Sequence, residues 1–269
     1  MFQNYEIVQL DEADRMLQSS TSKGNQTKWF RNNRYYKADS FGYEGLAEWV
    51  VSGLSECIQN FDYTPYKCCL IEEAGHSYNG CYSKSFLKPE ESFISFSHIL
   101  ELKYLDYSKQ MQNGFQSSFR FVCDEINKVT ELDVSSYIAQ NLYLDAIILN
   151  EDRHLNNLGI IKGDGYYRLA PVFDKGLSLL SDLKWYDIYE PIEKNMHLVK
   201  AKPFSSRFDK QIKELNKMGL IPLKIDRDKA MKMLDSLESA LYPEEYIVRC
   251  RTIIKKNLRK WEGFAWIEA

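Results

Sequence analysis

The 269-residue sequence predicts an α+β fold, in which a small strand-rich lobe precedes a larger helical lobe. Short strand patterns dominate the first third of the chain, with one helical pattern among them. Through the remainder, apolar residues recur mostly at helical spacing. We therefore expect an N-terminal lobe over residues 1–83 and a helical lobe over residues 84–269. A cleft between two lobes is a common place for a ligand.

The first lobe is predicted from short apolar runs separated by turn residues. Asn32-Asn33 marks a hairpin, and the small polar stretch 17–27 marks a loop. Between residues 42 and 58 the apolar side chains follow helical spacing, so one helix is expected there. The expected strands cover residues 5–10, 27–30, 34–37, 66–72 and 78–83.

The second lobe is predicted to begin with an amphipathic helix over residues 117–132. Asp133 can cap the next helix, which runs to Asn150. A tight hairpin at residues 162–165 joins two short strands. Further helices are expected at 206–219, 226–241 and 243–261.

Composition narrows the classes of partner and location. The formal net charge is −3, no run of eighteen apolar residues occurs, and the N-terminus lacks the pattern of a secretory signal. We therefore expect no direct nucleic-acid partner and no membrane. The six cysteines form no C-x-x-C motif, and adjacent Cys68 and Cys69 in an apolar run indicate buried free thiols. These features favour the cytoplasm, with export by a route without a signal peptide left open.

Two segments carry the residues that phosphoryl transfer requires. Residues 150–157 read Asn-Glu-Asp-Arg-His-Leu-Asn-Asn, and residues 173–176 read Phe-Asp-Lys-Gly. Asp152 can accept a proton from an acceptor hydroxyl, while Asn157 and Asp174 can supply oxygen ligands to magnesium. The intervening hairpin can bring Asp174 back beside Asn157. The pattern therefore predicts transfer of a phosphoryl group from ATP.

The spacing Asp-x4-Asn alone is weak evidence, because it also occurs by chance. Asp145 and Asn150 show the same spacing as Asp152 and Asn157. Asp145 lies inside a predicted helix, so we interpret it as structural. Asp152 lies in a loop just past the helix end, where catalytic acids are common.

The neighbours of Asp152 admit structural roles as well as chemical ones. His154 is either a catalytic base or, as we favour, a histidine that fixes the loop by hydrogen bonding. Arg153 is expected to brace a carboxylate or a phosphorylated loop. Asn150 could equally be a helix C-terminal cap.

Lys37 ends a strand pattern, and from there its ammonium could reach phosphate oxygens in the cleft. A lysine in that place needs a carboxylate to hold it. Glu44, near the start of the next helix, is the first choice, and Glu48, one turn later, is the second. Solvation at the surface is the alternative for any single lysine.

A short segment before this strand could approach phosphate through its backbone. It reads Gly24-x-Gln26-x-Lys28, in which the glycine allows close contact with backbone amides. With one glycine the pattern is weak by itself.

Taken in order, these residues resemble the HipA-like serine/threonine kinases, and the shorter CtkA-like members in particular. Residues 36–48, Tyr-Lys-Ala-Asp-Ser-Phe-Gly-Tyr-Glu-Gly-Leu-Ala-Glu, are similar to that family's lysine-to-helix segment, and the stretch 201–204, Ala-Lys-Pro-Phe, is similar too. The resemblance covers residues 5–220 and implies a protein-kinase-like bilobal fold that binds ATP and Mg²⁺.

The resemblance also implies roles for individual residues. Asp152 would be the catalytic base, Asn157 and Asp174 the metal ligands, and Lys37 the contact to the ATP phosphates. The hinge that meets adenine would lie at residues 81–86, with Tyr82 and Phe86 as its candidates. Family members can be autophosphorylated on a serine of the phosphate loop, for which this chain offers Ser19, Ser20, Thr21 and Ser22.

The expected function is that of a protein serine/threonine kinase, either a toxin or an effector, that acts on a serine or threonine of a protein. Longer HipA proteins carry an extra N-terminal region and pair with a DNA-binding antitoxin, so an antitoxin or regulator is a candidate partner. Two alternatives stay open. One is a kinase for a small molecule or lipid, and the other is a non-catalytic nucleotide-binding module, against which the intact acidic set argues.

Overall fold

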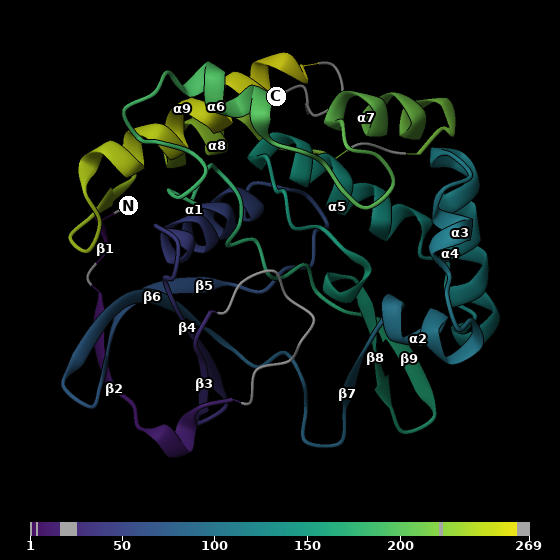
Figure 1. Cartoon of the computed structure of the whole chain (residues 1–269), viewed down its shortest axis with the longest axis horizontal. Coiled ribbons are helices and arrows are strands. Elements are labelled where there is room, and N and C mark those ends of the chain that lie inside the picture. Colours follow the sequence, from purple (N-terminus) through teal and green to yellow (C-terminus); the bar gives the residue numbers. More distant parts are fainter. Residues whose placement is uncertain (1, 4, 17–25, 221–222, 263–269) are drawn as a thin grey trace.

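A computed structural model of the chain describes residues 2–3, 5–16, 26–220 and 223–262. A strand-rich part and a larger helical part lie side by side, as Figure 1 shows, which confirms the predicted α+β class. In the described part, no helix is both long and apolar enough to cross a bilayer.

The main sheet has five strands in the order β2-β5-β6-β4-β3. Strands β3 and β4 form the predicted hairpin, whose turn residues Asn32 and Asn33 take φ values of 50° and 60°. Asparagine tolerates this left-handed region better than most residues, which explains the tight turn. The strands are β2 (Glu6–Gln9), β3 (Lys28–Arg31), β4 (Arg34–Ala38), β5 (Tyr66–Glu73) and β6 (His76–Lys84).

Helix α1 (Glu44–Ser55) packs between this sheet and the helices of the second lobe (Figure 1). Every residue of α1 is buried. Close backbone contact is possible because Gly45 faces Gly80 of β6, where a Cβ atom would come within 2.6 Å of the Gly80 carbonyl carbon. Helix α1, which carries part of the site, is therefore held by the sheet on one side and by helices of the second lobe on the other.

A second sheet, in the order β7-β8-β9, follows the chain's exit from β6. Strands β8 and β9 form the predicted hairpin, whereas β7 and the helix after it were not predicted. Strand β7 reads Ser-Phe-Ile-Ser, four residues that are too few to show a strand pattern. The elements are β7 (Ser92–Ser95), β8 (Gly159–Gly163), β9 (Tyr166–Leu169), η2 (Leu155–Asn157) and α2 (Phe96–Lys103).

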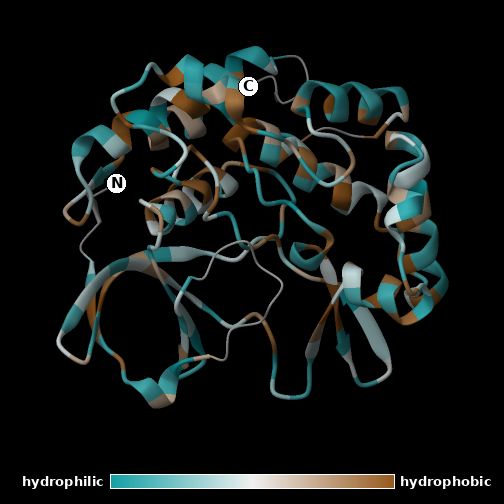
Figure 2. Cartoon of the chain, viewed as in Figure 1, coloured by the Kyte–Doolittle hydropathy of each residue, from teal (hydrophilic) through white to brown (hydrophobic). Residues whose placement is uncertain are grey.

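The remaining helices enclose α5, the central helix of the second lobe. In Figure 2 apolar segments of α1 and α5 lie inside the molecule, whereas the outer helix α7 is largely hydrophilic. The predicted N-cap of α5, Asp133, was wrong by one residue: Val134 is the N-cap, and the Asp133 carboxylate accepts a hydrogen bond from the Ser135 amide at 2.9 Å. The helices are α3 (Ser108–Met111), α4 (Phe115–Thr130), α5 (Ser135–Ile148), α6 (Ile192–Leu198), α7 (Phe208–Lys217), α8 (Arg227–Asp235) and α9 (Glu244–Lys260).

The C-terminal part of the chain returns to the first lobe. Strand β1 (Phe2–Gln3) pairs in parallel with β10 (Glu238–Ser239), and the Tyr242 hydroxyl donates to Asp39 at 2.7 Å. The predicted helix 226–241 is therefore wrong beyond Asp235, because its last residues form this strand and its turn. The lobe boundary at 83/84 remains a prediction.

Candidate active site

A buried lysine joins the two lobes. Lys37 of β4 places its Nζ atom 2.8 Å from Glu48 Oε1, on α1, and 2.7 Å from Asp174 Oδ1, in the loop after β9. The hydroxyl of Tyr66 lies 3.4 Å from the same nitrogen. One residue predicted to contact phosphate and one predicted to bind metal thus meet at a single point.

The preferred partner of Lys37, Glu44, was wrong, and the second choice, Glu48, forms the pair. The Glu44 carboxylate instead accepts hydrogen bonds from the backbone amides of Ser40, Phe41 and Gly42, at 3.1, 2.8 and 3.0 Å. It therefore closes the turn that leads into α1. One helical turn further on, the side chain of Glu48 points back toward β4.

Charges of opposite sign offset the cost of burying this cluster. Burial acts to lower the pKa of Lys37, but Asp174 and Glu48 outweigh it and hold that pKa well above its usual value. Burial acts to raise the pKa of Asp174, but Lys37 outweighs it and holds that pKa well below its usual value. Glu48 differs, because burial and the nearby Asp174 charge raise its pKa to about 6 despite Lys37. Asp174 is therefore the firmly ionised partner.

Backbone hydrogen bonds align the two predicted segments. The amide of Glu151 donates to the Leu177 carbonyl at 3.2 Å, and the amide of Leu179 donates to the Ile148 carbonyl at 2.8 Å. The end of α5 and the loop after Asp174 therefore run side by side, whereas the predicted approach of Asp174 to Asn157 stays a prediction.

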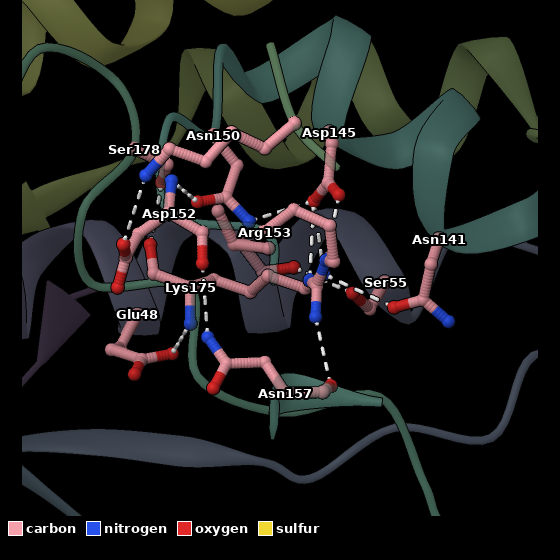
Figure 3. A network of polar contacts seen from close by, with 12 residues as sticks. Glu48, Ser55, Asn141, Asp145, Asn150, Asp152, Arg153, Asn157, Lys175 and Ser178 are labelled. Atoms are coloured by element: carbon pink, nitrogen blue, oxygen red, sulfur yellow. Dashed lines mark hydrogen bonds and ion pairs between the residues drawn. The ribbon is translucent and has the colours of Figure 1, made fainter. Parts of the chain in front are cut away.

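The loop after α5 is built around Asp145, a side chain with no exposed surface (Figure 3). Arg153 donates to it from Nε at 2.7 Å, Asn150 from Nδ2 at 2.8 Å, and Lys175 from Nζ at 3.1 Å. The structural interpretation of Asp145 is confirmed, and so is the expectation that Arg153 braces a carboxylate. Asn150 ties the loop to the helix by its side chain, while Leu149 takes the left-handed cap conformation.

The same loop positions Asp152. The amide of Asp152 donates to Asn150 Oδ1 at 3.1 Å, and its carbonyl accepts from Asn157 Nδ2 at 3.1 Å. Its carboxylate lies 3.5 Å from His154 Nε2 and 3.4 Å from Lys202 Nζ. Neither ring nitrogen of His154 makes a hydrogen bond within the described residues, so hydrogen bonding by this side chain does not fix the loop.

A small cavity brings several predicted residues together. Asp152 and Asp174 both line it, together with Gln26 and Lys28 of the predicted phosphate segment. Lys28 lies directly across the β3–β4 ladder from Lys37. The other lining residues are Phe41, Glu44, Gly176 and Leu177. Gly24 and the candidate phosphorylation sites Ser19, Ser20, Thr21 and Ser22 lie outside the described residues.

A larger apolar cavity of about 220 Å³ adjoins the Lys37 cluster. Three aromatic side chains form part of its wall: the rings of Phe86 and Phe173 lie 5.5 Å apart, and those of Phe93 and Phe173 lie 5.3 Å apart. Flat apolar walls of this kind suit a planar aromatic ligand. Its remaining lining residues are Met16, Lys28, Tyr35, Tyr36, Lys37, Tyr66, Ser83, Leu87 and Asp174.

Of the two hinge candidates, Phe86 lines this cavity and Tyr82 does not, while their contact with adenine stays a prediction. Strand β6 continues to Lys84, so the connection between lobes begins later than residue 81. Tyr82 does not line the cavity, because its ring packs 5.7 Å from Tyr36 and under Arg34. Adjacent residues of a strand point to opposite faces, and it is Ser83 that lines the cavity.

The predicted magnesium ligands have donor atoms that suit the ion. Asn157 uses Nδ2 for its hydrogen bond to Asp152, and Asp174 uses Oδ1 for Lys37. Within the described part of the chain, Asn157 Oδ1 and Asp174 Oδ2 make no hydrogen bond. No group of three or more His, Cys, Asp or Glu side chains is arranged there for a metal. One carboxylate and one amide fit magnesium, which completes its shell with phosphate and water.

Three residues in or beside the site were not predicted to belong to it: Lys175, Lys202 and Phe93. Lys175 follows Asp174 directly, yet a buried lysine cannot be told from an exposed one by its position. Lys202 is 50 residues away from Asp152 along the chain, so no spacing rule connects them. Phe93 lies in the strand that the pattern did not reveal.

The chain is similar to known proteins in its fold and not in its sequence. No family model and no curated protein sequence matches the chain. Among solved structures, the chain is similar to the Helicobacter pylori proinflammatory kinase CtkA, with 14% identity, a TM-score of 0.58 and coverage of 94% of this chain and 95% of that one. It is also similar to HipA of Shewanella oneidensis, solved in a complex with HipB and operator DNA, with 13% identity, a TM-score of 0.56 and coverage of 95% and 67%. The chain therefore has the bilobal α+β fold of the HipA-like kinases.

Proposed function

We propose that this chain is an ATP- and Mg²⁺-dependent protein serine/threonine kinase of the HipA-like type. The observation that carries the proposal is the Lys37–Asp174 pair, which lies at the border of an apolar cavity and of a second cavity lined by Asp152. Phosphoryl transfer from ATP needs an apolar cavity for the base, charged groups beside the phosphates and a carboxylate beside the acceptor hydroxyl, in this order.

In the proposed complex, adenine lies in the apolar cavity against Phe86, Phe93 and Phe173. The triphosphate then extends past Lys37 and Lys28, whose cations offset its negative charge. Magnesium held by Asn157 and Asp174 would supply further positive charge to the phosphate oxygens. Glu48 holds Lys37 in place for this role.

Asp152 serves as the acceptor for the hydroxyl proton. The acceptor oxygen forms a bond to the γ-phosphorus, the bond from that phosphorus to the β,γ-bridging oxygen breaks, and ADP leaves. The proton of the hydroxyl passes to the Asp152 carboxylate. Asn150 and Asn157 fix the backbone on either side of Asp152, so its carboxylate meets the acceptor in one orientation.

Labelled ATP with Mg²⁺ tests the proposal directly. The wild-type chain should transfer phosphate to a protein acceptor or to itself, and Asp152→Ala should lower the rate about 10²–10⁴-fold. Asp152→Ala should retain nucleotide binding, because Asp152 does not contact adenine. Equal transfer by both proteins would exclude the assigned base.

The acceptor class is tested by the same assay. Phosphate on serine or threonine, identified by mass spectrometry of the chain and of added proteins, supports the protein-kinase proposal. Transfer only to small molecules or lipid head groups would replace it with the second alternative. Failure to bind ATP with Mg²⁺ would leave a non-catalytic module.

Autophosphorylation and an antitoxin partner belong to the same proposal. The HipA structure contains HipB and its operator DNA, and this chain covers 67% of that HipA chain. We propose a regulatory partner protein for this chain as well, and phosphate on Ser19, Ser20, Thr21 or Ser22. Phosphosite mapping after incubation with ATP checks the second point.

A further inference from the structure

A further lysine lies beside the Asp152 carboxylate. Lys202 Nζ lies 3.4 Å from Asp152 Oδ1, and the lysine side chain is 33% exposed. In the described part of the chain, Asp152 is the one hydrogen-bond or ion-pair partner of this ammonium. Two of its three N–H groups are therefore available to a ligand that enters beside Asp152.

The segment around Lys202 is held firmly. Its carbonyl accepts a hydrogen bond from Nε2 of the fully buried Gln211, at 3.2 Å. The preceding amide, of Ala201, donates to the Ser206 carbonyl at 3.1 Å. Phe204 packs into the core with its ring 5.5 Å from that of Phe119. A flexible lysine stem thus projects from a fixed base toward Asp152.

The distribution of charges in the site allows the Lys202 ammonium a role beside the transferred phosphoryl group. Lys37 shares its charge with two carboxylates, Glu48 and Asp174, and so cannot meet the charge of the phosphates alone. A phosphoryl group that moves toward Asp152 brings its negative oxygens near another carboxylate. Cations that meet this charge during transfer are a major source of rate enhancement in phosphoryl transfer.

We infer that Lys202 is a further catalytic residue, which binds the γ-phosphoryl oxygens as the group moves to the acceptor. This inference rests on the proposed kinase function. Lys202 stays protonated throughout: it donates N–H groups to the transferred oxygens and to Asp152, while the bond changes and the proton transfer are those described for Asp152. A lysine that only paired with Asp152 at the surface would contribute little.

Nucleotide titrations test the contact without any acceptor. The probes are ADP and the non-hydrolysable analogue AMP-PNP, each with Mg²⁺, titrated by calorimetry into wild type, Lys202→Met and Lys200→Met. Lys200 is an exposed lysine two residues earlier in the same segment, and it serves as the matched control. Lys202→Met should weaken AMP-PNP binding roughly tenfold, as expected for a charged hydrogen bond, and leave ADP binding unchanged. Equal effects on both nucleotides, or none, would overturn the inference.

Turnover supplies the second readout. With labelled ATP, Lys202→Met should raise the KM for ATP about as much as it weakens AMP-PNP binding and should also lower kcat roughly 10- to 100-fold, and Lys202→Arg should recover part of the loss. Thermal melting of each variant identifies any loss that comes from misfolding. Wild-type transfer with equal rates in Lys202→Met and Lys200→Met would reject the role of Lys202 and leave the kinase proposal standing. Absence of transfer in the wild type would reject the proposed function and the inference that rests on it.

Discussion

Lys37 Nζ lies 2.7 Å from Asp174 Oδ1, a contact that spans 137 positions of the sequence. It ties the fourth strand of the first lobe to the loop that carries the predicted magnesium ligand. We expect Lys37→Met to lower kcat/KM for ATP about 10²–10³-fold, because the transferred group loses a fixed cation. Steady-state kinetics with labelled ATP measures this. Lys37→Arg should restore little, because a planar guanidinium cannot replace a point charge held by two carboxylates. Full activity of either variant would contradict the assignment.

Glu44 and Glu48 provide a matched pair of variants, one turn apart on the same helix. Glu48→Gln should weaken nucleotide binding and turnover together, because Lys37 loses its partner on α1. Glu44→Gln should leave the Lys37 pair intact. It should destabilise the turn at residues 40–42, because the Glu44 carboxylate accepts hydrogen bonds from the backbone amides of that turn. Calorimetric titration with ATP separates the two effects from thermal melting. The reverse pattern would restore Glu44 as the functional partner.

The pKa of Glu48 gives the site a dependence on pH. Burial raises this pKa from 4.5 to about 6, so the ion pair with Lys37 is complete above pH 6 and is lost as the pH falls through that value. Turnover should decline below pH 6, and Glu48→Gln should lack this inflection. The stability effect has the opposite sign: because the folded-state pKa is raised, ionising Glu48 makes folding less favourable as the pH rises from 4.5 to about 6. A pH profile that is the same in both proteins would count against this account.

The Arg153–Asp145 pair predicts a large loss of stability when it is broken. Both side chains have no exposed surface, and Arg153 also donates to the Asn157 carbonyl at 2.9 Å. Arg153→Met should lower the free energy of unfolding by about 3–5 kcal/mol, because a buried carboxylate loses its main partner. Denaturant unfolding measures this. Arg34→Met is the control: its pair with Glu6 is exposed, so the change should stay below about 1 kcal/mol.

Phe86 and Tyr82 test the location of the adenine cavity. Phe86 lines the apolar cavity, whereas Tyr82 does not, and its ring lies 5.7 Å from that of Tyr36. Phe86→Ala should raise the dissociation constants of ATP and ADP roughly tenfold, through lost contact with the base. Tyr82→Phe should leave both constants unchanged. Loss of binding in the Tyr82 variant alone would return the hinge to residues 81–84.

Much of this fold could be predicted because its helices and strands follow clear periodic patterns. The Asn32-Asn33 hairpin, α4, α5 and the β8–β9 hairpin all lie near their predicted positions. The short strand β7 and the pairing of β1 with β10 could not be predicted. Such elements of two to four residues carry no period, and long-range partners create them.

Residues of the candidate site could be predicted where the neighbouring sequence distinguishes them. They could not be predicted where the direction of a side chain depends on how helices and strands pack. Asp145 and Asp152 share one spacing, and the helical position of Asp145 correctly identified it as structural, while the role of Asp152 stays a prediction. Glu44 and Glu48 lie on the same helix, and only the packing of α1 against β4 determines which one meets Lys37. Lys202 needed the fold itself, because the α6–α7 connection brings it to Asp152 from far along the chain.

One buried side chain has a consequence for how products leave. Lys175 donates its backbone amide to Glu48 at 2.9 Å and its ammonium to Asp145 at 3.1 Å, so a single residue fastens α1 to α5. A wide separation of the two lobes would break both hydrogen bonds and leave the buried charges of Glu48 and Asp145 without their partner. Release of spent nucleotide should therefore proceed without wide separation of the lobes, with α1 and α5 moving as one rigid unit.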